Sequence, residues 1–146
     1  LEIGQMAIIR MQDIGSLSLP GAMARPGMKI GVEPATTGEA YARGFNEATI
    51  KLYDNPELAF AALRRGDINF YIHDAPTSWK IAQSSDYGDL MPLYRPLTKE
   101  QLAWAVKKGN QKLLDELNQA LGQLITNGSA GLIQNHWIPV KVEVKD

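Results

Sequence analysis

Short β-prone segments that alternate with helical ones constrain the fold of this chain more than any other feature of its sequence. Three such steps follow one another, with predicted strands over residues 29–32, 49–53 and 68–72 and predicted helices over residues 37–45, 56–65 and 77–83. Strands that alternate with helices form a mostly parallel sheet with helices on its faces. We therefore predict an α/β fold, a three-layer sandwich with the sheet as its middle layer.

Three further strands are predicted outside this repeat. Residues 5–10 form the first, and a polar, Pro-containing loop over residues 12–26 follows it. Residues 91–94 and residues 102–106 form the other two, separated by a polar stretch. All three have the length and apolar character of strands.

The last third of the chain is predicted to be helical. A long helix is expected over residues 111–127, and Gly128 suits the position after its end. Its apolar face consists of Leu113, Leu114, Leu117, Leu121, Leu124 and Ile125. A shorter helix is expected over residues 130–137, and the tail over residues 138–146 is either an edge strand or disordered.

The composition allows one hydrophobic core and excludes several classes of partner. With 146 residues, of which 45% are hydrophobic, the chain can bury one ordinary core but not two independent ones. The 15 Lys and Arg residues balance the 16 Asp and Glu residues, so no net charge attracts nucleic acid or anionic lipid. No apolar run reaches the roughly 20 residues of a membrane span, and residues 1–5 lack the layout of a signal peptide.

Metal binding, cofactor binding and covalent catalysis have little support in the sequence. The chain has no cysteine, and its two histidines, His73 and His136, have no other ligand at metal-binding spacing. A Ser78 or Ser84 nucleophile near His73 is a weak alternative, because no G-x-S-x-G elbow is present. We therefore predict no metal, no cofactor and no enzymatic activity.

The first candidate binding element is the turn between the predicted strand 29–32 and the helix that follows it. This turn contains Thr36, Thr37, Gly38 and Glu39. Backbone N–H groups at such a turn are unpaired and can hold a carboxylate or phosphate, and Gly38 allows close approach. The alternative is a capping box, in which Thr36 caps the helix and Glu39 completes the box. The two interpretations are compatible.

The second candidate is Asp74, which follows the third predicted strand of the repeat. Ligands of open α/β sheets bind outside the carboxyl ends of the strands, so a carboxylate at this position is suited to an ammonium group. The alternative is that Asp74 only caps the next helix, because Pro76 stands at the start of that helix.

The order of these motifs resembles the second lobe of the periplasmic polar-amino-acid-binding proteins, the solute receptors of ABC importers. The resemblance spans residues 4–138 and rests on spacing rather than on one motif. The matching stretches are Thr36-Thr37-Gly38-Glu39, Gly66-Asp67-Ile68-Asn69, Asp74-Ala75-Pro76, Pro96-Leu97-Thr98, Ala103 to Gly109, and Asn127-Gly128 with Trp137. The family has the type II periplasmic-binding-protein fold, in which two lobes close on a ligand about a hinge.

The resemblance implies roles for the candidate residues. Thr37 and Gly38 would hold the carboxylate of the ligand, with Thr36 in the same turn, and Asp74 would hold its α-ammonium group. Residues 1–106 would be the second lobe, with hinge strands near residues 5–10 and 102–106. Residues 107–146 would be C-terminal helices that pack on the first lobe.

Two departures from the family pattern affect these expectations. The N-terminal part of the first lobe has no counterpart, so we expect the chain to be a fragment or a truncated relative. Without that part, the apolar face around Leu113, Leu117, Leu121 and Leu124 has no partner, and a homodimer through this helix is one way to cover it. In addition, Pro34-Ala35 stands where relatives have a glycine-containing approach to the threonines.

The resemblance predicts a periplasmic solute-binding protein that takes a small polar, amino-acid-like ligand or small carboxylate and delivers it to a membrane permease. An alternative is a sensory or regulatory module of a membrane receptor or cell-wall lytic enzyme, since the same lobes occur there. A third possibility is a dehydratase of the same fold, which would need a general acid–base that none of the named loops contains.

Overall fold

The computed structural model describes residues 1–19 and 21–138, which divide into two compact units. Among the described residues, one unit spans Glu2–Gln101, and the other contains Leu1 and residues 102–138. The predicted boundary after residue 106 and the assignment of the parts to two lobes stay predictions.

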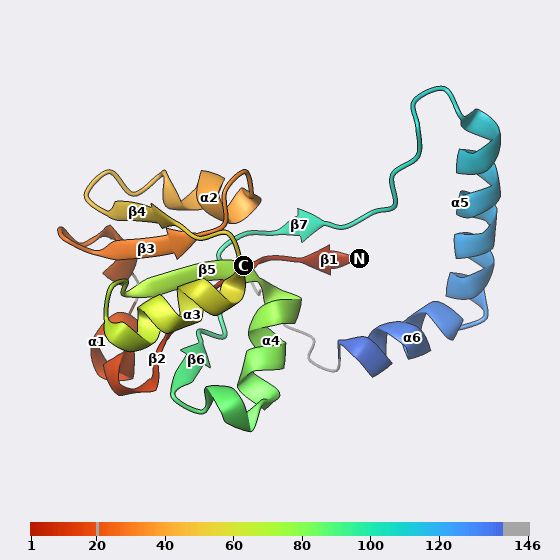
Figure 1. The fold of residues 1–146 in the computed structure, drawn as a ribbon. Coiled ribbons are helices and arrows are strands. Elements are labelled where there is room, and N and C mark those ends of the chain that lie inside the picture. The colour runs from red at the N-terminus through yellow and green to blue at the C-terminus, as the bar shows by residue number, and fades with distance from the viewer. Residues whose placement is uncertain (20, 139–146) are drawn as a thin grey trace. The chain divides into compact units, whose positions relative to one another are not determined.

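A five-stranded sheet forms the centre of the first unit (Figure 1). Its strands are β2 (Gln5–Arg10), β3 (Lys29–Val32), β4 (Thr49–Leu52), β5 (Phe70–Asp74) and β6 (Leu90–Pro92), in the spatial order β4-β3-β5-β2-β6. β3 is parallel to β4 and β5, whereas β2 is antiparallel to β5 and β6. Four of the five strands therefore run in one direction, which confirms the predicted mostly parallel sheet.

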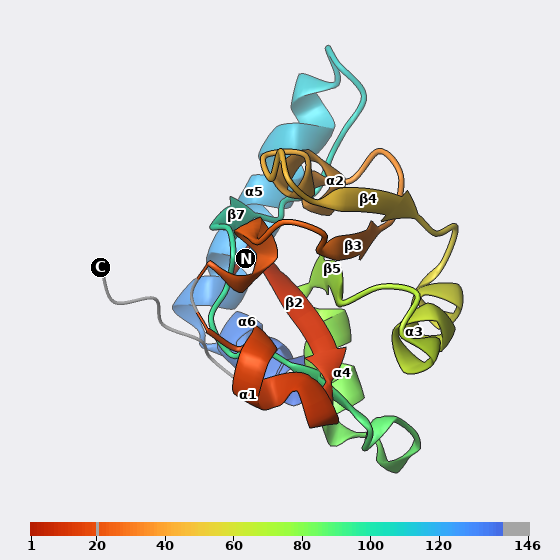
Figure 2. The ribbon, with the colours of Figure 1, turned by 90° about the vertical axis from the view of Figure 1, so that its left-hand side faces the viewer.

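Helices cover both faces of this sheet (Figure 2). They are α1 (Ile14–Leu17), α2 (Thr37–Ala42), α3 (Pro56–Arg65) and α4 (Ala75–Gln83). Along β2, Ala7 and Ile9 pack in a core cluster with residues of α1 and α2, whereas Ile8 packs in a second cluster with residues of α3 and α4. This alternation follows from the two-residue repeat of a strand. The three-layer sandwich is thus confirmed.

Local signals account for helix α3, which has the predicted bounds. Asn55 accepts a hydrogen bond from the Leu58 backbone N–H through Oδ1, and Pro56 occupies the first turn. Gly66 follows the last helical residue in a left-handed conformation, with φ of 78°. The buried face of the helix, which includes Phe60 and Leu63, packs on the sheet.

Several predicted elements differ from the structure in kind or in bounds. The loop predicted over residues 12–26 contains helix α1 and two short 3-10 segments, Met11–Asp13 and Ala22–Ala24. The strand predicted over residues 68–72 corresponds to β5, which lies two residues further along the chain. Pairing with β2 sets its bounds, because the residues of β2 pair with Tyr71, Ile72, His73 and Asp74. The helix predicted over residues 37–45 ends at Ala42, after which the chain turns back toward β4.

The prediction of a strand over residues 102–106 is wrong. Instead, β1 (Glu2–Ile3) pairs with β7 (Glu100–Gln101) in a separate antiparallel ladder. Leu102 still exchanges backbone hydrogen bonds with Leu1, but residues 103–106 are in no strand. A strand requires a neighbour for its backbone groups, and the apolar character that suggested one here comes from exposed side chains such as Trp104.

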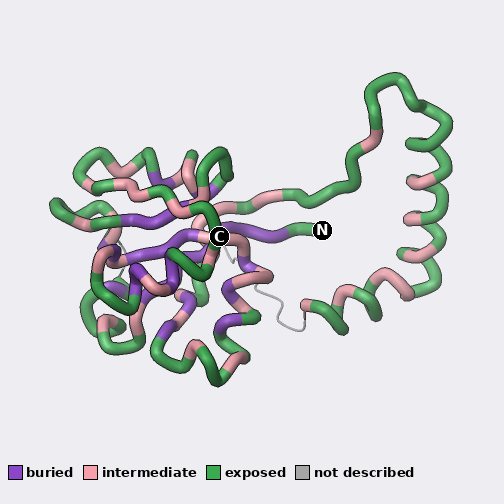
Figure 3. Tube along the Cα trace, viewed as in Figure 1, coloured by how far each residue is buried: buried purple, intermediate pink, exposed green. Residues whose placement is uncertain are grey.

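The second unit contains the two predicted C-terminal helices, α5 (Gln111–Thr126) and α6 (Ser129–Trp137). Asn110 caps α5 by accepting a hydrogen bond from the Leu113 backbone N–H, at 3.3 Å. None of residues 102–138 is buried, whereas most residues of strands β2, β3, β5 and β6 in the first unit are buried (Figure 3). The tail predicted over residues 138–146 lies outside the described residues from position 139 onward. Among the helices described here, none has the length and apolar character to span a bilayer.

Candidate ligand-binding site

The candidate residues lie where the order of the strands reverses. From β3 the chain moves outward to β4 and then returns across β3 to form β5 on its other side. Thr37 begins the helix after β3, and Asp74 is the last residue of β5. Both strands end at the edge of the sheet near β7 (Figure 1). In open α/β sheets, this reversal leaves a crevice outside the strand ends in which ligands bind.

The side chain of Asp74 does not cap helix α4, although Asp74 occupies the N-cap position. Its Oδ1 atom instead accepts a hydrogen bond of 2.5 Å from the Nε2 atom of Gln5. The two residues face each other across the β2–β5 ladder, which is why their side chains meet. The capping interpretation of Asp74 is therefore wrong, and its carboxylate lies at the reversal point.

Gln5 connects the two predicted binding elements, and its role was missed at the sequence level. Its Nε2 atom also donates to the Thr37 hydroxyl, at 2.9 Å, and the residue is 2% exposed. Because an ionised Asp74 carboxylate only accepts hydrogen bonds, the amide nitrogen must face it. The amide oxygen is then directed toward Gly38, where the Cβ atom of any larger residue would lie 2.8 Å from it. The available signal was a polar residue directly before the four apolar residues of strand β2.

A second set of hydrogen bonds joins Thr37 to Thr98 and Glu100, near the C-terminal end of the Glu2–Gln101 unit. The Thr37 hydroxyl donates to Oε2 of Glu100 at 2.9 Å, and the Thr98 hydroxyl donates to Oε1 of the same carboxylate at 2.5 Å. The backbone N–H of Gln5 donates to the Thr98 hydroxyl at 2.9 Å. Glu100 and Thr98 therefore belong to the same network as Gln5, Thr37 and Asp74.

Thr36 caps helix α2, as the capping-box interpretation predicted. Its hydroxyl accepts from the backbone N–H of Glu39 at 3.1 Å and donates to the carbonyl of Glu33 at 2.8 Å. The Glu39 carboxylate accepts from the backbone N–H of Ala35, one residue before the usual partner in such a box. Hydrogen bonds from Arg43 and Ala35 hold the pKa of Glu39 below its usual range. A direct role of Thr36 in ligand binding stays a prediction.

The turn carries backbone strain at Ala35, whose φ is 59°. Left-handed conformations are unfavourable for residues with a Cβ atom by roughly 1–2 kcal/mol. We therefore expect Ala35→Gly to raise the free energy of unfolding by about 0.5–1 kcal/mol, a net gain that remains after the added entropy of glycine in the unfolded chain is subtracted. Urea denaturation of the variant would measure this. Ala61→Gly, in the middle of helix α3, should have the opposite effect, and a loss of stability in both variants would contradict the strain argument.

The buried side chain of Tyr71 lies near this turn, on the face of the sheet that α3 and α4 cover. The Tyr71 hydroxyl donates to Oε1 of Glu33 at 3.4 Å, and Nε2 of His73 is 3.7 Å from the same oxygen. Burial and then the Glu33 carboxylate raise the pKa of Tyr71 far above its usual value. These contacts hold Glu33, the residue whose carbonyl anchors Thr36.

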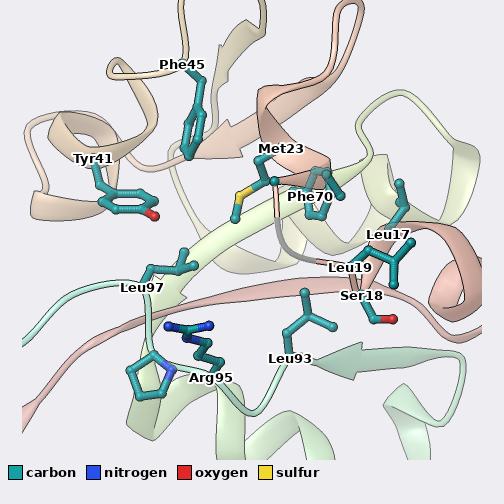
Figure 4. Close-up of a pocket in the computed structure, with 13 residues that line it drawn as sticks. Leu17, Ser18, Leu19, Met23, Tyr41, Phe45, Phe70, Leu93, Arg95 and Leu97 are labelled. Atoms are coloured by element: carbon teal, nitrogen blue, oxygen red, sulfur yellow. The ribbon is translucent and has the colours of Figure 1, made fainter. Parts of the chain in front are cut away.

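A cavity of about 350 Å³ lies on the face of the sheet covered by α1 and α2 (Figure 4). Its walls are mostly apolar and include Leu17, Met23 and Phe70, and Arg95 and Tyr41 contribute polar groups. None of the predicted site residues lines it. Among the described residues, no group of three potential metal ligands lies together.

Solved structures with the same fold were found by structure comparison. No protein-family model matches the sequence, and no curated protein matches it. A putative binding component of an ABC transporter from Wolinella succinogenes, complexed with lysine, has a TM-score of 0.82 and 27% identity. It is matched over 94% of this chain and 59% of that chain. The chain thus has the type II periplasmic-binding-protein fold.

Two further structures agree with this assignment. A mutant of ArgBP from T. maritima has a TM-score of 0.81 and 22% identity, over 96% of this chain and 59% of that one. An ancestral amino-acid-binding protein, described as a precursor of cyclohexadienyl dehydratase, has a TM-score of 0.81 and 23% identity. The match covers 94% of this chain and 57% of that protein. These comparisons confirm the resemblance to amino-acid-binding proteins of this fold. The chain spans less than two thirds of the length of each of these proteins.

Proposed function

We propose that this chain binds a small polar, amino-acid-like solute between the Thr37–Gly38 turn and Asp74. The observation that carries this proposal is the position of the Asp74 carboxylate, which is not used to cap helix α4 and is linked to Thr37 through Gln5. Such a link holds an acidic group and a hydroxyl in a defined arrangement at the strand reversal. In this proposal, Asp74 accepts hydrogen bonds from the ammonium group of the solute.

The chemistry of the compared proteins supports an amino-acid-like solute. Their structures include one complexed with lysine, one in an arginine-bound form and one bound to glutamine. An α-ammonium group is common to these three ligands, and a carboxylate at the position of Asp74 is a suitable partner for it. The proposal therefore concerns the α-ammonium end of the solute and not its side chain.

Within this proposal, the chain acts outside the cytoplasm as a receptor for the permease of an ABC transporter, by analogy with the binding component from Wolinella succinogenes. The alternative, a sensory or regulatory module, would use the same site for the same class of ligand. The fold is also found in an ancestral cyclohexadienyl dehydratase, and for this chain we propose binding rather than catalysis. The homodimer predicted through Leu113, Leu117, Leu121 and Leu124 stays a prediction.

The proposal is tested by ligand-induced thermal stabilisation of the parent chain and of Asp74→Ala. Amino acids and small carboxylates are screened, because a ligand present at 100 times its Kd stabilises the native state by about 2.7 kcal/mol. We expect at least one amino acid to raise the melting temperature of the parent and to have no such effect on Asp74→Ala.

Asp54→Ala is the matched control, because Asp54 is an exposed aspartate outside the network. It should respond to the ligand as the parent does. Stabilisation that persists in Asp74→Ala would place the ligand elsewhere in the molecule and contradict the proposed site. If no compound stabilises the parent, solute binding by this chain is contradicted.

A further inference from the structure

The Thr37 hydroxyl already has an anionic partner in this structure. A hydroxyl has one hydrogen to donate, and Thr37 donates it to Glu100 while it accepts from Gln5. A ligand carboxylate that uses the same hydroxyl must therefore displace the Glu100 carboxylate or lie beside it. Glu100 is not among the residues on which the resemblance to the amino-acid-binding proteins rests.

Glu100 is held in place by more than one contact. Its second oxygen accepts from Thr98, whose hydroxyl also accepts the Gln5 backbone N–H. Gln5 is buried and joins both Thr37 and Asp74, so the Glu100 carboxylate is attached to the most constrained part of the site. None of the ion pairs among the described residues involves Glu100 or Asp74. The Glu100 carboxylate thus contacts Thr37 without an ion-pair partner among the described residues.

We infer that Glu100 is a specificity-determining residue, which disfavours a ligand carboxylate at Thr37 relative to a neutral or positively charged group. Two carboxylates that share one hydroxyl repel each other, and only one of them can accept its hydrogen. This inference rests on the proposed binding site. It changes the expected ligand preference at one end of that site and leaves the role of Asp74 unchanged.

Arginine and agmatine are suitable probes, because agmatine is arginine without its carboxylate. Binding of both compounds is measured by isothermal titration calorimetry for the parent chain, for Glu100→Gln and for Glu100→Ala. The first substitution removes the charge at nearly constant size, and the second removes the competing acceptor. Glu47→Gln changes the net charge equally at an exposed position outside the network and serves as the control.

We expect the affinity for arginine relative to agmatine to rise about tenfold in Glu100→Gln and Glu100→Ala, and to be unchanged in Glu47→Gln. This is the size of effect that follows from loss of one unfavourable interaction of about 1.4 kcal/mol. Arginine binding that appears only in the Glu100 variants would support the inference in the same way. A purely structural role of Glu100 would lower the melting temperature without changing this ratio.

The outcomes separate the inference from the proposed function. If the parent binds either compound and the ratio is the same in all four proteins, the inference is wrong, whereas solute binding stands. If neither compound binds to the parent or to either Glu100 variant, the inference is also wrong, and the screen with Asp74→Ala decides whether another solute occupies the site.

Discussion

Replacement of Gly4 by alanine is expected to destabilise the Glu2–Gln101 unit by about 3 kcal/mol, at the upper end of the usual effect of overpacking. A Cβ atom at this position would lie 2.1 Å from the carbonyl oxygen of Thr98 and 3.1 Å from Cβ of Pro96. Backbone atoms cannot move aside as a side chain can. The Thr98 segment is also fixed, because the Leu97 backbone N–H donates to the carbonyl of Gln5 at 2.7 Å.

The effect of Gly4→Ala should extend to the candidate site. The carbonyl of Gly4 accepts from the backbone N–H of Ala75 at 2.9 Å, directly after Asp74. Urea denaturation followed by circular dichroism measures the loss of stability. Gly15→Ala is the control, because a Cβ atom there would meet no atom within 4 Å beyond its own helical turn, and the φ of Gly15 is not positive. Equal stability of the two variants would show that the chain relaxes at Gly4 and would contradict the close approach.

Gln5→Leu is expected to lower the free energy of unfolding by about 2 kcal/mol and to abolish ligand-induced stabilisation. Leucine has a similar volume, so the main change is the loss of the hydrogen bonds to Thr37 and Asp74. Polar groups left without a partner in a buried setting are unfavourable by about 1–3 kcal/mol, and more when charged. Gln12→Leu, at an exposed position, should change the stability by less than about 0.5 kcal/mol.

A double-mutant cycle shows whether Gln5 acts through Asp74. If the hydrogen bond between them accounts for much of the effect, Gln5→Leu should be less destabilising in the Asp74→Ala background, by about 1 kcal/mol. Additive effects would mean that Gln5 contributes through packing or through Thr37 alone. The same variants, tested with a stabilising solute, show whether the loss of binding follows the loss of this contact.

Local sequence signals predicted most of the helices and strands of the sheet unit, but not all of their ends. Helix α3 has the predicted bounds because Asn55, Pro56 and Gly66 set its ends through their own backbone preferences. Strand β5 was displaced by two residues because pairing with β2, a strand far away in sequence, sets its bounds. Residues 103–106 have apolar character but are in no strand, since pairing depends on a neighbour that local sequence does not specify.

For the candidate site, the sequence was sufficient to indicate the Thr37–Gly38 turn and Asp74, because each follows a strand in a predicted strand–helix step. It was also sufficient to establish the α/β class, since periodicity and helix caps are local properties. Only the tertiary structure placed Gln5 and Glu100 in the site. They are 32 and 63 residues from Thr37 in sequence, and their contacts with it arise from strand register and chain crossing, which bring distant segments together.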